Sequence, residues 1–177
     1  MPGKFLREDT ASQKHHRRMN TALTISRWLV FLLTAVLILV NLFTHVLQVV
    51  RYTGDGMEPG LHSGQTLVLQ KTANVTEGDI IAFYYNNQVL VRRVICTGGR
   101  QIDIEEDGTV LVNSAVLEEP YLTEKSMGQC TISLPFHVQT DEVFVMGDNR
   151  AVAMDSRLEE IGPIPVERII GKVIFKI

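Results

Sequence analysis

Two thiols and two histidines are among the side chains of this sequence with the widest chemistry. Cys96 and Cys130 are its only cysteines, and they could form a disulfide in an oxidising compartment if their Cα atoms approached within about 7 Å. The sequence leaves that pairing open. His62 and His137 stand at no recognisable metal-ligand spacing, so we expect no metal site, no cofactor and no cysteine catalysis.

A second chemically dense stretch lies at residues 147–157, where acidic, amide and basic side chains alternate over a few positions. Their charges are complementary, and buried polar groups are normally satisfied by one another. We therefore expect a hydrogen-bonded structural network rather than a reactive centre. Its expected members are Asp148, Asn149, Arg150, Asp155 and Arg157.

The elements that must position these residues are predicted to be β-strands. After residue 50 the sequence consists of short alternating segments separated by turn signals, and no long apolar repeat of 3.6 residues occurs. Asn86-Asn87 and Asp107-Gly108 each predict a tight hairpin turn. The sequence predicts a mainly β, twisted antiparallel domain. The expected strands are 65–70, 79–85, 88–96, 101–105, 109–112, 131–134, 142–146 and 169–177.

The apolar stretch at residues 28–50 contains no Lys, Arg, Asp or Glu. As a helix it would be about 34 Å long at ~1.5 Å per residue, enough to cross a hydrocarbon core of ~30 Å. It is longer than the apolar core of a cleaved signal peptide, about 7–15 residues, and no small-x-small cleavage site follows it. We therefore predict one retained N-terminal transmembrane helix.

Charge is distributed unevenly along the chain, whose net charge is −3. Basic side chains outnumber acidic ones over residues 1–27, and acidic side chains outnumber basic ones in the rest. The positive-inside rule then predicts a single-pass protein of the cell membrane, with a basic cytoplasmic tail at 1–27, the anchor at 28–50 and an extracytoplasmic β domain at 51–177. An acidic domain also argues against nucleic acid as a partner.

An ordered set of motifs resembles the type I signal peptidases over nearly the whole chain. Residues 54–61 resemble their Gly-x-Ser-Met-x-Pro-Thr-Leu, residues 92–99 their Lys-Arg-Val-Ile-Gly, and residues 147–157 their Gly-Asp-Asn-Arg-x-x-Ser-x-Asp-Ser-Arg. Further matching segments lie at 64–71, 78–83, 112–113 and 119–122. The resemblance implies a signal-peptidase-like β domain. It also implies descent from enzymes that cleave signal peptides with a Ser nucleophile and a Lys general base.

Three positions depart from the catalytic pattern of that family. Gly56 stands at the position of the nucleophilic Ser, Arg92 at that of the Lys, and Ala153 at that of a supporting Ser. Glycine has no side chain, and a guanidinium with a pKa above ~12 cannot serve as a base in a protein. The resemblance therefore implies the fold without the peptidase activity. If the backbone bulges, Asp55 could instead enter the vacated site and pair with Arg92.

The alternative is an active signal peptidase I that cleaves signal peptides of exported proteins with a displaced Ser/Lys dyad. Ser63 and Lys71 are the nearest such residues. On one continuous strand their Cα atoms would lie about 26 Å apart, beyond the reach of any hydrogen bond.

In the family the substrate lies as an extended strand beside the nucleophile, and such pairing uses main-chain groups that survive loss of the nucleophile. The resemblance makes Asp55, Met57, Pro59 and Leu61 candidates for the groove, although the last three could equally be ordinary core or loop residues. The implied partner is an exported protein or signal-peptide segment. The absence of the catalytic side chains resembles that in signal-peptidase-like accessory proteins, which are encoded in pilus gene clusters of Gram-positive bacteria. This resemblance implies a chaperone-like role in pilus assembly, with pilin and sortase as partners.

Overall fold

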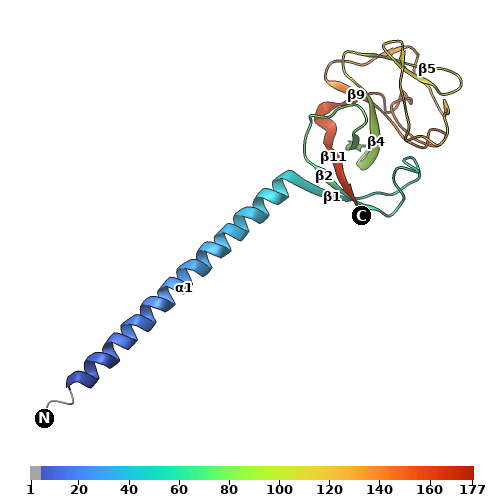
Figure 1. Ribbon diagram of the computed structural model, residues 1–177. Helices are drawn as coiled ribbons and strands as arrows, with labels where there is room; N and C mark the ends of the chain where they lie inside the picture. The colour runs from blue at the N-terminus through green and yellow to red at the C-terminus, as the bar shows by residue number, and fades with distance from the viewer. Residues whose placement is uncertain (1–4) are drawn as a thin grey trace. The chain divides into compact units, whose positions relative to one another are not determined.

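A computed structural model describes the backbone of residues 5–177 and the side chains of residues 24–41 and 43–177. The chain divides into two compact units, residues 1–45 and 46–177, which are taken here one at a time. Figure 1 shows the course of the chain from α1 in blue to β11 in red.

The N-terminal unit is formed by α1, Phe5–Val46. Its segment Thr24–Val46 is long and apolar enough to cross a membrane, judged by length and composition. The side chains of Trp28, Leu29 and Phe31 are exposed, so this surface needs an apolar environment that the helix itself does not supply. Residues 1–4 of the predicted basic tail lie outside the described residues, and the rest of that tail continues into α1.

The predicted end of the apolar anchor at residue 50 is wrong by four residues. The helix ends at Val46, and Leu47–Arg51 forms strand β1. β1 pairs antiparallel with β2, Thr66–Gln70, with Val49 opposite Val68 and Val50 opposite Leu67. The apolar pattern alone could not mark this change, because β-branched residues fit a strand as well as an apolar helix, and only the partner strand decides between them.

A seven-stranded antiparallel sheet is the larger layer of the β unit, in the order β1-β2-β11-β3-β4-β9-β10. In Figure 1, β2 and β11 lie side by side, and β4 lies next to β9. The remaining strands are β3 (Ile80–Tyr85), β4 (Gln88–Thr97), β9 (Glu142–Met146), β10 (Ile164–Pro165) and β11 (Ile169–Lys176); a short 3-10 helix, Val166–Arg168, precedes β11.

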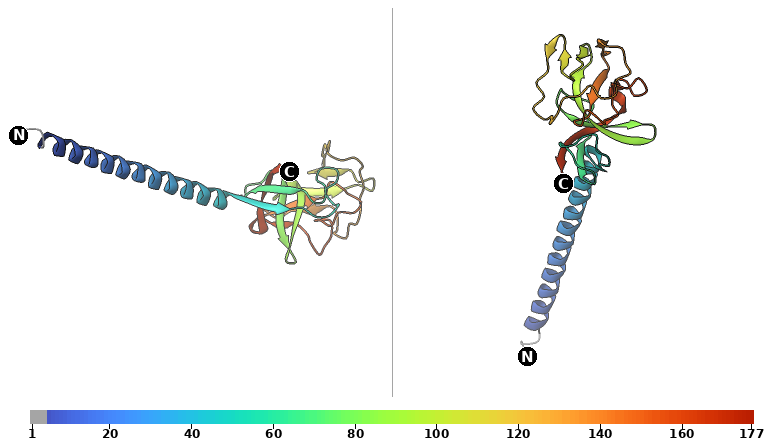
Figure 2. Two further views of the ribbon diagram at one scale, coloured as in Figure 1. Left: turned by 90° about the horizontal axis from the view of Figure 1, so that it is seen from below. Right: turned by 90° about the vertical axis from the view of Figure 1, so that its right-hand side faces the viewer.

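A four-stranded sheet in the order β7-β6-β5-β8 forms the second layer. Its strands are β5 (Gln101–Ile104), β6 (Val110–Val112), β7 (Ala115–Val116) and β8 (Phe136–His137). Figure 2 shows these strands in yellow and orange in two further views. Alternate residues of β5 and β6 face a core that includes Ile102, Val110 and Phe144, so the two sheets share buried contacts.

The mainly antiparallel β architecture confirms the predicted fold class. The Asn86-Asn87 turn is also confirmed, because both residues have positive φ, 44° and 61°, as a two-residue hairpin of this type requires. The strand predicted at 131–134 is wrong. The backbone N–H groups of Thr131 and Ile132 donate to the carbonyl of Arg157, so this segment is tied to a loop instead of a strand ladder. Strands β1, β7, β8 and β10 were not predicted.

Candidate functional site

Strand β4 carries the central residue of the site, Arg92. β4 pairs with β3 along residues 88–93, whereas its pairing with β9 begins only at Arg93. Within the described residues, the β9-side edge of β4 is therefore unpaired over residues 88–92. Because neighbouring residues of a strand point to opposite faces, Arg92 and Arg93 enter different surroundings. The β3–β4 hairpin itself extends from the sheet (Figure 2), and Tyr84 and Val89, which pair near its Asn86-Asn87 turn, are exposed.

Gly56, Arg92 and Ala153 lie together. A Cβ added at Gly56 would be 3.2 Å from Nη2 of Arg92, 3.3 Å from its Cζ and 3.5 Å from Cα of Ala153. Gly56 belongs to the loop between β1 and β2, and Ala153 to the loop after β9. The backbone N–H of Asn149 donates to the Gly56 carbonyl over 3.1 Å, which joins the two loops.

Arg92 is buried, with 6% of its surface exposed. Its Nε donates to the Met154 carbonyl over 2.8 Å, and its Nη1 donates to the Val91 carbonyl over 2.6 Å. No carboxylate within the described residues lies at ion-pair distance from it. Burial lowers the pKa of the guanidinium, and the charge of Asp155 partly offsets that effect. Arg92 is thus a buried cation held by carbonyl groups alone.

The hypothesis that Asp55 pairs with Arg92 is wrong. The Asp55 side chain is exposed, and none of the ion pairs of the described residues joins it to Arg92. The Asp55 carbonyl instead accepts a hydrogen bond of 3.3 Å from the Asn149 side-chain amide. The loop places the carboxylate toward solvent, where an ionised group keeps its hydration.

A cleft of about 240 Å³ opens at Gly56 and Arg92, and we call it the Gly56 cleft. Its lining is partly apolar, and Val152 and Met154 on its rim are 59% and 50% exposed. Asp55 lies on the same rim. The cleft follows residues 89–92, the stretch of β4 whose edge is unpaired.

Two of the predicted groove residues are not in a groove. Met57 and Leu61 are fully buried in a core cluster with Leu67, Leu69 and Ala82. The loop can bury them because the Met57 N–H donates to the hydroxyl of buried Tyr52 over 3.0 Å, which satisfies a backbone group at the turn. The groove prediction is therefore wrong for these two residues.

Pro59 is exposed and lines a separate cleft of about 320 Å³. Glu58, Thr123, Glu124, Asp148 and Asn149 contribute to the same lining. The four groove candidates thus divide between the Gly56 cleft, this second cleft and the core. Alternation of exposure in an irregular loop follows no fixed period, so the sequence could not assign them.

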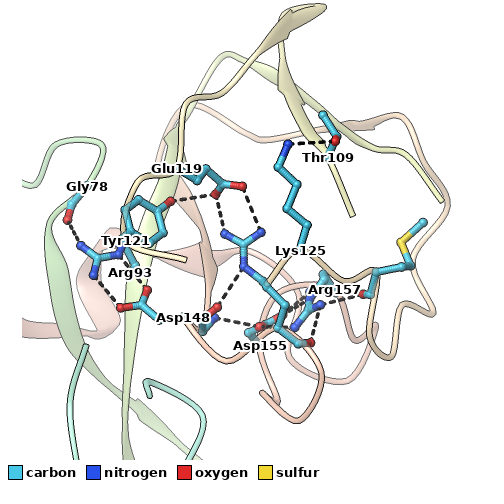
Figure 3. A network of polar contacts seen from close by, with 12 residues as sticks. Gly78, Arg93, Thr109, Glu119, Tyr121, Lys125, Asp148, Asp155 and Arg157 are labelled. Carbon is cyan, nitrogen blue, oxygen red and sulfur yellow. Dashed lines mark hydrogen bonds and ion pairs between the residues drawn. The ribbon is translucent and has the colours of Figure 1, made fainter. Parts of the chain in front are cut away.

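The predicted polar network exists, but two of its pairs have partners outside the predicted set (Figure 3). Asp148 accepts two hydrogen bonds from Arg93, 2.8 Å to Oδ1 and 2.6 Å to Oδ2. The buried pair Arg150 and Glu119 is likewise bidentate, and Tyr121 donates to Glu119 over 2.7 Å. The Tyr121 ring also lies 4.0 Å from the Arg93 guanidinium.

One ion pair of the network, Arg157–Asp155, joins two members of the predicted set. Arg157 donates to both carboxylate oxygens of Asp155 over 2.8 Å, and its Nη1 donates to the Met127 and Arg150 carbonyls. The sequence reasoning missed Arg93, Glu119 and Tyr121. One signal was available for Arg93, since it neighbours Arg92 on a strand and must face the opposite side.

The remaining reactive side chains contribute little to the site. Cys96 is buried and Cys130 half-buried, and both are free thiols; burial raises the pKa of Cys96 to about 12. No group of three His, Cys, Asp or Glu residues suited to a metal ion occurs in the part of the chain that the structure describes. Ser63 precedes β2 and Lys71 follows it. A five-residue strand keeps such residues about 16 Å apart or more, too far for a dyad.

Residues 25–177 match the family described as signal peptidase, peptidase S26. The chain is 34% identical over 131 residues to signal peptidase I T of Bacillus subtilis, covering 67% of each chain. It is 28% identical over 172 residues to signal peptidase IB of Staphylococcus aureus, covering 86% of this chain and 88% of that one.

Among solved structures, a signal peptidase I from Enterococcus faecalis matches with 26% identity and a TM-score of 0.48, covering 56% of this chain and 96% of that one. The apolar segment Thr24–Val46 together with the relatives indicates a membrane-anchored protein.

Proposed function

Because this chain belongs to the signal peptidase (peptidase S26) family, we propose that it is a member without peptidase activity that binds an extended segment of an exported protein. The proposed site is the Gly56 cleft, and the proposed role is that of a chaperone-like accessory factor. The observation that carries the proposal is the Arg92 guanidinium packed against a glycine, at the positions where the family resemblance calls for a base and a nucleophile.

Hydrolysis through an acyl-enzyme needs an activated oxygen and a base that can give up its proton at the working pH. Gly56 supplies no oxygen from a side chain. Burial lowers the pKa of Arg92, yet a guanidinium starts so high that it stays charged in proteins. Ala153 lacks the supporting hydroxyl that the resemblance places beside the other two groups. Each substitution therefore removes a different part of the chemistry.

Peptide binding does not need any of those groups. The unpaired edge of β4 beside the Gly56 cleft offers main-chain N–H and C=O groups to an added strand. Val152 and Met154 offer apolar contact at the rim. Gly56 keeps its backbone N–H as a donor. Together these features support capture of an extended polypeptide without cleavage.

The proposed orientation places the N-terminal tail in the cytoplasm and the β unit outside, since residues 1–27 carry an excess of basic side chains. Segments of exported proteins would then meet the cleft after they cross the membrane. The specific form of the proposal is an accessory role in pilus assembly, with a pilin and a sortase as partners. It rests on the resemblance in the pattern of substitutions.

Hydrolysis and binding together test the proposed function. The full chain in detergent micelles is incubated with a fluorogenic signal-peptide substrate, with Bacillus subtilis signal peptidase I T as the active control. We expect no hydrolysis above the rate without protein, and measurable binding of the same peptide. Hydrolysis that Ser63→Ala or Lys71→Ala abolishes would instead establish the displaced dyad.

The pilus role has its own test. In cells, cross-linking from Val152 at the rim of the cleft should capture a pilin, and loss of the protein should shorten pilus polymers. Pili of normal length together with capture of other exported proteins would leave the binding function in place and remove the pilus assignment.

A further inference from the structure

Arg92 differs from the three other arginines of the site in having no counter-ion among the described residues. Arg93, Arg150 and Arg157 each form an ion pair with a carboxylate, from Asp148, Glu119 and Asp155 respectively. Only 6% of the surface of Arg92 is exposed, and its side chain donates hydrogen bonds to two carbonyl groups. Burying a charge without an ionic partner is costly.

The unused donors of Arg92 belong to the end of its guanidinium. Nε is committed to Met154 and one N–H of Nη1 to Val91. A guanidinium carries five N–H groups, so Nη2 and the second N–H of Nη1 remain. Nη2 is also the atom that lies 3.2 Å from the position of a Gly56 Cβ, and both residues line the Gly56 cleft.

The local charge around Arg92 favours an anion. The Asp155 carboxylate is the largest of the influences that raise the pKa of Arg92, but that carboxylate is bound bidentately by Arg157. Arg157 in turn lowers the pKa of Arg92, as a nearby like charge does. Arg92, Asp155 and Arg157 together carry a net positive charge, and the Asp55 carboxylate on the rim of the cleft is exposed to solvent, which screens its charge. Two parallel N–H donors at the end of a guanidinium match the two oxygens of a carboxylate in spacing and plane.

We infer that the Gly56 cleft binds a carboxylate, with the end of the Arg92 guanidinium as its receptor and the unpaired edge of β4 beside it for the attached peptide. The inference deepens the proposed function and rests on it, because it names the chemical group that the captured segment must present. Two sources carry that group: the C-terminal carboxylate of a polypeptide, and the side chain of an Asp or Glu inside an extended segment.

Three short alanine- and valine-rich peptides with the same N-terminal fluorophore test the inference. The first ends in a free carboxylate, the second in an amide, and the third ends in an amide and carries one internal Glu. Their affinities for the full chain in detergent micelles are measured by fluorescence anisotropy at neutral pH. Charge-assisted hydrogen bonds predict that a carboxylate peptide binds at least about tenfold tighter than the plain amide.

The outcomes separate the inference from the proposed function. Tighter binding of the first peptide alone assigns a chain terminus, and tighter binding of the third as well assigns side-chain carboxylates too. Equal binding of all three overturns the inference and leaves peptide capture intact. Absence of binding by all three overturns the proposed function and the inference with it.

Variants then locate the receptor. Arg92→Gln should abolish the tighter binding of the carboxylate peptides relative to the plain amide, and Arg92→Lys should keep part of that preference because it keeps charge without the planar fork. Arg168→Gln is the matched control, since Arg168 is exposed and lies outside the lining of the cleft. A preference that survives in Arg92→Gln would overturn the assignment. The comparison of peptides on the unaltered chain does not depend on whether a variant folds.

Discussion

The Arg92 guanidinium packs against Gly56, with Nη2 3.2 Å from the place where a Cβ would stand at that glycine. Gly56 and Arg92 therefore lie next to each other across the loop and the strand. The Arg92 side chain on β4 extends toward the loop at Gly56, and Cα of Ala153 lies 3.5 Å from the same point.

Gly56→Ala and Gly147→Ala should differ in their effect on stability. At Gly56 the added Cβ meets the flexible end of Arg92, which can shift, so we expect a loss of free energy of unfolding below about 1 kcal/mol. At Gly147 the Cβ would overlap the Gly56 carbonyl oxygen and the Ala153 Cβ, and overpacking costs about 1–3 kcal/mol or more. Urea unfolding of both variants measures the difference. Equal losses would contradict the contact geometry.

Gly56→Ser combined with Arg92→Lys should recover peptidase activity. Arg92 Cζ lies 3.3 Å from the site of a Gly56 Cβ, so a Lys ammonium reaching about as far would meet the Ser hydroxyl. General-base assistance accelerates such steps by about 10²–10⁴-fold, so the double variant should exceed either single variant by at least about 10²-fold. Cleavage of the signal-peptide substrate is the measurement. The single variants are the controls, since each lacks one of the two groups.

A folded double variant with no activity would mean that the cleft no longer presents a peptide bond to position 56. Adding Ala153→Ser tests whether the missing supporting hydroxyl is responsible, because Ala153 lies beside the same point. Recovery only in the triple variant would assign that role to position 153.

Glu119→Ala should destabilise the β unit far more than Glu77→Ala. Glu119 and Arg150 have 1% and 0% of their side chains exposed, and the change would leave a buried guanidinium unpaired, a loss of about 3–5 kcal/mol. The Glu77–Arg100 pair is 32% and 42% exposed, and such surface pairs contribute about 0–1 kcal/mol. Denaturant unfolding gives both values. Losses within about 1 kcal/mol of each other would argue against the buried network.

Cys96 should resist alkylation in the native protein while Cys130 reacts. Burial raises the pKa of Cys96 to about 12, and the thiolate is the reactive form. Cys130 is only half-buried, although burial raises its pKa as well. Iodoacetamide labelling at pH 8 followed by peptide mass analysis distinguishes the two. Labelling of Cys96 at the same rate as Cys130 without unfolding would contradict its burial.

The raised pKa of Cys96 also makes the free energy of unfolding depend on pH. The folded state holds the Cys96 proton more tightly than the unfolded chain, whose thiols have a pKa near ~8.5. The contribution to stability is therefore fully present below that pH and falls as the pH rises toward about 12. Thermal unfolding of Cys96→Ala should show a weaker alkaline loss than the unaltered chain. An unchanged alkaline loss would assign it to other groups, such as Tyr52, whose pKa burial also raises.

Sequence reasoning was strongest where local chemistry decides the structure. The Asn86-Asn87 hairpin and the strand Glu142–Met146 followed from turn residues and alternation alone. It failed where a distant partner decides. The sequence predicts residues 47–50 as the end of an apolar helix, but they pair with β2. It predicts 131–134 as a strand, but the N–H groups of Thr131 and Ile132 donate to the Arg157 carbonyl.

The side-chain chemistry of the candidate site was determined by sequence alone, because the absence of an oxygen at Gly56 and of a usable base at Arg92 is a property of residue type. Tertiary structure decided everything that depends on contacts between distant segments. It buried Met57 and Leu61, turned Asp55 to solvent and paired Asp148 with Arg93. It also left Arg92 without a carboxylate, since the charge balance around a buried group depends on which loops pack against it.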